Sequence, residues 1–207
     1  MPITKQDILP MDVYAAQRQS IRTCMLPLKK VRRIAIGPCA TLFFENYDTM
    51  WYQIHEMLLT EKGGEDQISD ELAAYNPLIP GGDNLKATLM FEVENPVERL
   101  AFLRSIVHVE QHIFLQVDAQ VIRAQPIDAQ ERTRPSDGKT SAVHFLTFPF
   151  LSAQKNLLLE RTDLPVMVGI DHPEYTHKAG CPVPLRDAFK ADLSINSFKA
   201  NVRQGHI

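Results

Sequence analysis

The chain has 207 residues, of which 44% are hydrophobic and 23% charged, and its formal net charge at pH 7 is −3. This balance predicts a globular protein with an ordinary core, and it argues against a nucleic-acid-binding protein that works through a basic face. Because the sequence shows no secretory signal, no apolar run near the roughly 20 residues of a membrane span and no CxxC pair, we expect a cytoplasmic protein with no membrane segment.

Hydrophobic spacing and turn residues predict helices and strands that do not alternate strictly. In the first half, the pattern predicts a helix, two strands, two helices and a strand, at residues 12–26, 33–36, 41–44, 49–61, 66–76 and 87–93. In the second half it predicts a helix, two strands, a helix, a strand and a helix, at residues 96–107, 112–117, 141–148, 152–160, 165–170 and 185–193. This order favours a single α+β domain over residues 1–193, with a largely antiparallel sheet and flanking helices, followed by a flexible tail at 194–207.

Polar side chains gather where the second predicted strand passes into a helix. The cluster consists of Glu45, Asn46, Gln53 and Glu56. Side chains at such a junction converge on rigid supports, so Glu45 is a candidate metal ligand or general acid–base and Asn46 a candidate orienting residue. In the structural alternative, Asp48 or Thr49 caps the helix and the two polar residues on the helix face solvent.

Histidines provide a second group of candidates. Asp171 and His172 follow a short apolar run, so the imidazole is expected at the carboxyl end of a strand, and His144 lies inside another apolar strand. If the two strands are neighbours, the two imidazoles together with Glu45 or Glu56 form a two-histidine, one-carboxylate site for a divalent metal ion. The alternatives are a buried, hydrogen-bonded His144, and an Asp171 that forms an Asx-type turn with Pro173 while His172 packs against Tyr175.

A basic run at residues 29–33 precedes the first strand. Within it, Lys30 and Arg32 are candidates for binding an anionic ligand in a cleft. Such a run also suits a solvated strand edge that discourages aggregation. Among the cysteines, Cys181 is the thiol that we select for a test of reactivity, because His177 lies four residues upstream.

Several stretches of the sequence are long enough to be distinctive. They are LKKVRRIAIGP at 28–38, LFFENYDTMWYQIHEM at 42–57, YNPLIPG at 75–81, ATL at 87–89, SAVHF at 141–145 and GIDHP at 169–173. In these stretches the chain resembles a bacterial domain-of-unknown-function family, DUF3501, over about residues 3–193. The polar positions that match the family pattern are Glu45, Asn46, Asp48, Gln53, Glu56, His144, Asp171 and His172.

The resemblance implies a physiological role but no particular reaction. Members of this family are typically encoded beside a rubrerythrin-like di-iron protein and an iron–sulfur oxidoreductase subunit, which implies a role in bacterial redox or peroxide-stress physiology. Our first hypothesis is therefore a non-catalytic accessory protein that acts with one of these partners. The second is a metal-dependent enzyme that uses the histidine and carboxylate site, and the third is a binder of a small anionic ligand.

Overall fold

Helices and antiparallel sheets make up the computed structural model, which describes residues 1–127, 133–134 and 138–194. The helices are α1 (Met11–Val31), α2 (Tyr47–Glu61), α3 (Gly64–Tyr75), α4 (Pro96–Ser105), α5 (Ser152–Glu160) and α6 (Val183–Leu193). Short 3-10 turns lie at η1 (Lys5–Asp7), η2 (Asn76–Leu78) and η3 (Val109–Gln111). The predicted α+β fold, built on antiparallel strands with flanking helices, is therefore confirmed.

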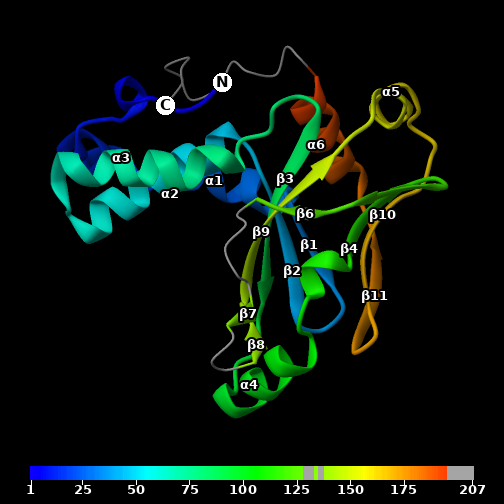
Figure 1. The fold of residues 1–207 in the computed structure, drawn as a ribbon. Helices are drawn as coiled ribbons and strands as arrows, with labels where there is room; N and C mark the ends of the chain where they lie inside the picture. Colours follow the sequence, from blue (N-terminus) through cyan, green and yellow to red (C-terminus); the bar gives the residue numbers. More distant parts are fainter. Residues whose placement is uncertain (128–132, 135–137, 195–207) are drawn as a thin grey trace.

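Two antiparallel sheets share the larger hydrophobic core (Figure 1). Sheet A has the order β1 (Arg33–Ile36), β2 (Ala40–Glu45), β3 (Asn84–Phe91), β9 (Val143–Pro149) and β6 (Gln125–Pro126). Sheet B has the order β11 (Tyr175–Gly180), β10 (Val166–His172), β4 (Ile113–Val117) and β5 (Gln120–Arg123). A third pair consists of β7 (Thr133–Arg134) and β8 (Lys139–Thr140). The chain passes from sheet B to sheet A between β5 and β6, which brings the two sheets around one core.

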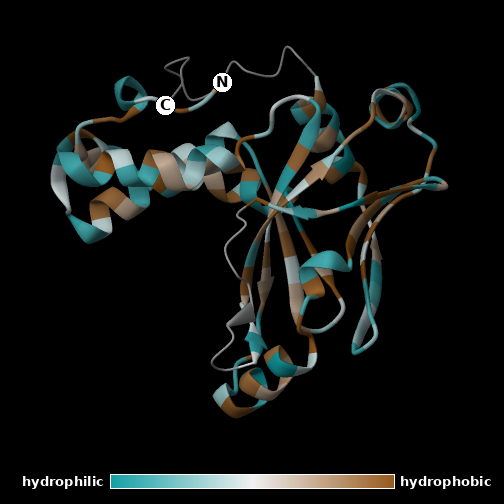
Figure 2. Ribbon diagram, viewed as in Figure 1, coloured by the Kyte–Doolittle hydropathy of each residue, from teal (hydrophilic) through white to brown (hydrophobic). Residues whose placement is uncertain are grey.

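Alternation along the strands gives sheet A an inner and an outer face. In β3, Leu85 and Leu89 are fully buried on the inner face, whereas Lys86 and Thr88 point to the outer face. Figure 2 shows hydrophobic residues along the strands of both sheets. Because side-chain direction has a period of two residues, the strand register decides which polar side chains share a face, and this becomes important for the site below.

Helix α6 covers one end of the shared core. Its Leu185, Phe189 and Leu193 are fully buried, and the Phe189 ring lies edge-on to Phe44 of β2, with ring centroids 4.4 Å apart. Aromatic pairs in this geometry add about 0.5–1.5 kcal/mol beyond the area that they bury. The inner face of sheet A is therefore sealed at this end by side chains of α6.

Helices α1, α2 and α3 form an arm that extends to one side of the sheets and has its own hydrophobic cluster (Figure 1). Sequence spacing predicts a core stripe of Met50, Ile54, Met57, Leu58 and Glu61 on α2. Of these, Met50, Ile54 and Leu58 are buried, whereas Met57 is partly buried and Glu61 is exposed. Tyr14 of α1 packs edge-on against Trp51 of α2, with ring centroids 6.1 Å apart. Among the described residues, no helix combines the length and the apolar character needed to cross a membrane.

Some predicted boundaries differ from the structure for physical reasons. Helix α1 continues through Pro27 to Val31, past its predicted end at residue 26. The positive charges of Lys29 and Lys30 in its last turn interact favourably with the negative, C-terminal end of the helix dipole. Strands β5 and β11 were not predicted, because both are mostly polar edge strands of sheet B with few buried positions. The predicted tail lies outside the described residues from 195 onward.

Candidate functional site

Glu45 lies at the end of β2, on the outer face of sheet A, where helix α2 begins. Its Oε1 accepts a hydrogen bond from the Thr88 hydroxyl at 2.8 Å, and its Oε2 accepts one from the Thr49 hydroxyl at 2.7 Å. Burial raises the pKa of the Glu45 carboxyl, while the two hydroxyls and the nearby cations of Lys29 and Arg32 lower it. Both carboxylate oxygens therefore have partners within the fold.

Asn46 caps helix α2 and does not orient Glu45. Its Oδ1 accepts a hydrogen bond from the backbone N–H of Thr49 at 2.9 Å, and its own backbone N–H donates to the Thr49 hydroxyl at 2.9 Å. This reciprocal pair is a capping box, so the cap that we predicted at Asp48 or Thr49 lies at Asn46. Burial raises the pKa of Asp48, the second residue of the helix, and the charge of Arg32 lowers it.

Gln53 and Glu56 join the helices of the arm to one another. Glu56 accepts two hydrogen bonds of 2.8 Å from Arg18 and one of 2.7 Å from the Tyr14 hydroxyl, both on α1. The hydrogen bonds from Arg18 are the main cause that lowers the pKa of Glu56. Gln53 lies near the hydroxyl of Tyr75 on α3; burial raises the pKa of that hydroxyl, and Gln53 lowers it. These two side chains therefore have structural partners and are not simply solvated.

His144 lies on β9 with its ring on the inner face of sheet A, and it is 1% exposed. Its Nε2 lies 2.8 Å from the carbonyl oxygen of Ser141. Because a carbonyl oxygen only accepts hydrogen bonds, Nε2 carries the proton and has no lone pair for a metal ion. The ring is edge-on to Phe91, with centroids 6.0 Å apart. The structure therefore agrees with the buried, hydrogen-bonded alternative for this histidine.

Asp171 and His172 lie within β10, which runs two residues past its predicted end at 170. His172 donates from Nε2 to the Val107 carbonyl oxygen at 3.1 Å and accepts from the Glu174 N–H at Nδ1, at 3.2 Å. Both nitrogens of this imidazole are thus bonded to the main chain, which gives it a structural role. The turn alternative for Asp171 does not hold, because that residue pairs with Thr176 in the β10–β11 hairpin.

The side chain of Asp171 is the centre of a small surface network. Its carboxylate binds Arg123 with N–O distances of 2.8 and 2.7 Å, and His112 Nδ1 lies 3.3 Å away. The hydrogen bonds from Arg123 are the main cause that lowers the pKa of Asp171. The rings of His112 and His172 meet edge-on, with centroids 5.0 Å apart. Sequence spacing gave no sign of His112 as a neighbour of this pair.

The three predicted metal ligands do not converge. Glu45 pairs with Lys86 on the outer face of sheet A, whereas His144 pairs with Leu89 on the inner face. His172 belongs to the other sheet. In the part of the chain that the structure describes, no group of three or more His, Cys, Asp or Glu side chains is placed to bind a metal ion. These residues therefore do not form the predicted two-histidine, one-carboxylate site.

The predicted anion-binding residues are also separate. Arg32 is 7% exposed, and its guanidinium binds both carboxylate oxygens of Asp192 on α6 at 2.8 Å. Because the two terminal nitrogens of the Arg32 guanidinium already donate to Asp192, they are not available to bind an anionic ligand in the same way. Lys30 is exposed on the last turn of α1. The pair Arg32–Asp192 instead joins the arm to the two-sheet body.

Cys181, the thiol that we selected for reactivity, is buried at 7% exposure. Burial raises its pKa to about 12, and the charge of Arg186 lowers it only in part. Because the thiolate is the reactive form, the structure places this cysteine among the inert, structural thiols.

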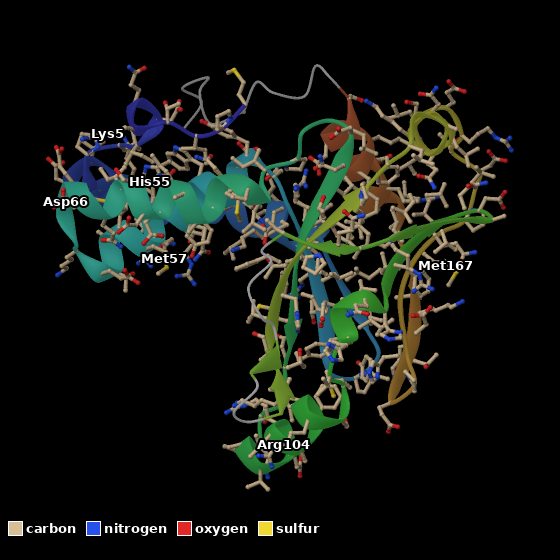
Figure 3. All side chains as sticks on the ribbon, in the orientation of Figure 1. Lys5, His55, Met57, Asp66, Arg104 and Met167 are labelled. Carbon is tan, nitrogen blue, oxygen red and sulfur yellow. The ribbon has the colours of Figure 1, made fainter. Side chains whose placement is uncertain are left out.

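A groove of about 700 Å³ lies at the tip of the arm, away from all of these residues. One wall consists of the N-terminal segment and the start of α1, and the other of the end of α2 and the start of α3. The partly exposed aliphatic side chains of the floor are Ile8, Leu9, Met11, Leu59 and Ile68. The charged side chains of the rim are Lys5, Asp12, Lys62 and Glu65. Figure 3 labels Lys5 and Asp66 at this tip of the arm.

The first wall is held in place by side chains of the helices behind it. We call residues 3–10 the strap. At its start, the Asn76 side chain accepts from the Ile3 N–H at 2.7 Å and donates to the Ile3 carbonyl at 2.9 Å. Further along, the Trp51 indole N–H donates to the Asp7 carbonyl at 2.8 Å. The strap is therefore fixed at points along its length before any ligand arrives.

His55 holds the strap at the groove itself. This fully buried imidazole of α2 accepts a hydrogen bond at Nε2 from the Leu9 N–H at 3.0 Å, and its Nδ1–H donates to the Trp51 carbonyl at 2.7 Å. Its ring packs against those of both Trp51 and Tyr14, with centroids 3.9 and 4.8 Å away. Burial lowers the pKa of His55, so the neutral form required by these bonds prevails at neutral pH.

The groove had one weak signal in the sequence. Leu59 follows the buried Trp51 and His55 of α2 at intervals of four residues, so these three side chains lie on one side of the helix, yet Leu59 is only partly buried. An aliphatic side chain that continues such a row without being covered leaves apolar surface for another contact.

Comparisons with known proteins give a family and a fold without a reaction. The sequence pattern of the family described as "Protein of unknown function (DUF3501)" matches residues 2–193. A crystal structure of a novel protein of unknown function from Burkholderia pseudomallei has a similar fold, with a TM-score of 0.84 and 38% sequence identity. That match covers 94% of this chain and 100% of the other. None of the curated proteins matches the chain.

Proposed function

The chain belongs to the family of proteins of unknown function DUF3501, and from the groove at the tip of its arm we propose that it is an accessory protein that binds a partner protein. The observation that carries this proposal is a groove of about 700 Å³ with an aliphatic floor and a charged rim. An exposed apolar surface of this kind on a folded protein marks an interaction site.

The distribution of polar groups in the groove favours a protein partner over a small molecule. Small-molecule sites orient their ligand with a few polar groups that converge inside the pocket. Here the charged side chains lie at the rim, and the floor is aliphatic. An apolar centre within a polar rim is the usual anatomy of a protein–protein interface.

The groove is also formed before a partner binds. The strap is fixed by Asn76, Trp51 and His55, so its main chain does not need to become ordered on association. Ordering of loops and side chains is one of the main free-energy costs of binding. A wall that is already ordered leaves more of the contact energy of the floor for affinity.

The family resemblance suggests which partners to test. We propose that the partner is a rubrerythrin-like di-iron protein or an iron–sulfur protein of the kind typically encoded beside members of this family, in bacterial redox or peroxide-stress physiology. We further propose that the complex forms in a reducing cytoplasm, where Cys24, Cys39 and Cys181 remain thiols.

The test compares an acidic substitution in the groove with the same substitution elsewhere. Ile68→Glu places a charge on the floor of the groove, near the start of α3, where an acidic residue suits the helix dipole. Val97→Glu is the matched control, because Val97 is 77% exposed and lies in the first turn of α4, at another end of the molecule.

Binding of each purified partner is measured by calorimetry with wild-type protein and both variants. We expect one partner to bind the wild type and the Val97→Glu variant equally, and to bind the Ile68→Glu variant at least about tenfold more weakly. Circular dichroism checks that both variants fold. The proposal fails if neither partner binds the wild type, or if Ile68→Glu binds as tightly as the control.

A further inference from the structure

We infer that the partner enters the groove as an amphipathic helix whose flanking charges match the rim, an inference that rests on the proposed function.

Residues 8–10 of the strap, which follow the η1 turn, form a non-helical part of the groove walls, and they cannot accept an added strand. The Ile8 N–H already donates to the Lys5 carbonyl at 3.3 Å, and the Leu9 N–H donates to His55. Pro10 has no N–H. Strand addition needs a row of main-chain donors and acceptors along an open edge, and these consecutive residues offer no donor.

The other wall consists of the end of α2 and the start of α3, and neither offers the open edge of a strand. The Lys62 N–H, for example, donates to the Leu58 carbonyl at 3.2 Å and closes the last turn of α2. An occupant that covers the aliphatic floor must therefore satisfy its own main-chain groups. A helix does this internally, and it presents apolar side chains at i, i+3, i+4 and i+7 to such a groove.

The rim charges give the helix a direction across the groove. Lys5 of one wall and Glu65 of the other are 2.7 Å apart and neutralise each other. Asp12 and Lys62 lie on opposite walls, and the described part of the chain provides no ion-pair partner for either. A complementary helix therefore carries a basic residue on the side of Asp12 and an acidic residue on the side of Lys62.

Designed peptides of about five helical turns test this directly. The first peptide has a leucine stripe flanked by lysines on one side and glutamates on the other. The second exchanges the lysines and glutamates, and the third is the first peptide with a central proline that breaks the helix. Binding is measured by fluorescence anisotropy with the wild type, with Ile68→Glu and with the double variant Asp12→Lys, Lys62→Glu.

We expect the wild type to bind one charge arrangement roughly two- to fivefold more tightly than the other, as rim ion pairs contribute little each. The double variant should reverse this preference, Ile68→Glu should weaken both helical peptides, and the proline peptide should not bind. Equal binding of the proline peptide overturns the inference. So does the absence of binding by every peptide while the whole partner remains sensitive to Ile68→Glu, a result that leaves the proposed function standing. A partner that ignores Ile68→Glu overturns the proposed function itself.

Discussion

The two hydrophobic clusters of this molecule differ in how far their edges are covered by other side chains. The core between the sheets is sealed by α6, whose Phe189 packs on Phe44. The cluster of the arm stays open at the tip, where Leu59 and Ile68 remain partly exposed in a groove. The difference shows where apolar side chains gather in one groove, whereas exposed hydrophobic side chains of the body, such as Val97, Leu151 and Val183, lie at the starts of three different helices.

The polar residues follow the same division. In the body, His144 and His172 donate to main-chain carbonyls, and the Glu45 carboxylate accepts from two threonine hydroxyls. Each of these groups forms hydrogen bonds with neighbouring groups, as buried polar side chains usually do. Residue types that carry chemistry in enzymes serve here to stabilise the fold, and the surface proposed for function is aliphatic.

Removal of the buried ion pair between arm and body should have the largest effect on stability. Asp192→Ala leaves the Arg32 guanidinium buried and unpaired, so we expect the free energy of unfolding to fall by about 3–5 kcal/mol, measured by urea denaturation. The double variant Arg32→Met, Asp192→Leu removes both charges and should recover most of that loss. If Asp192→Ala alone costs no more than a surface substitution, arm and body are not joined through this pair.

Most of the fold could be predicted from the sequence, because it follows from local patterns. The stripe of α2, the β1–β2 hairpin around Gly37 and the full extent of α5 (Ser152–Glu160) all come from residue spacing and turn residues. Gly37 has a φ of +70°, and an added Cβ would lie 2.5 Å from the His177 ring, so only glycine suits this turn. The edge strands β5 and β11 could not be predicted in this way, because few of their side chains are buried.

The candidate site was much harder to predict, since it depends on long-range register. Glu45 and His144 both lie next to β3, yet they occupy opposite faces of sheet A, and a sequence without pairing information cannot show this. Arg32 and Asp192 are 160 positions apart. His55 is recognisable only when the strap is known to pass over it. These contacts depend on how the elements assemble.

Loss of the His55 hydrogen bonds should have the next largest effect. His55→Phe keeps an aromatic ring packed against Trp51 and Tyr14 but leaves the Leu9 N–H without its acceptor, so we expect a loss of about 1–3 kcal/mol in the free energy of unfolding. Amide hydrogen exchange should increase at Leu9 in particular. Unchanged exchange there would mean that the strap is held without this imidazole.

The same histidine should make stability depend on pH. Unfolded His55 titrates near its ordinary pKa of about 6.5, whereas burial lowers the pKa in the folded protein. Between these values the unfolded chain binds more protons, so stability falls as pH drops below about 6.5 and levels off under the folded pKa. The size is about 1.4 kcal/mol for each unit by which the pKa is lowered. Urea titrations at several pH values should show this slope in the wild type and not in His55→Phe, and parallel curves would contradict it.

The smallest effect is expected for the ion pair at the mouth of the groove. Lys5 and Glu65 are 2.7 Å apart, but their side chains are 63% and 82% exposed, so solvent screens their attraction. Glu65→Gln should leave the urea midpoint unchanged within error, and Lys5→Gln should do the same. A loss as large as that of His55→Phe would show that the strap depends on this surface contact. Comparison of these variants with His55→Phe then shows whether the strap is held by buried hydrogen bonds or by the exposed ion pair at the mouth of the groove.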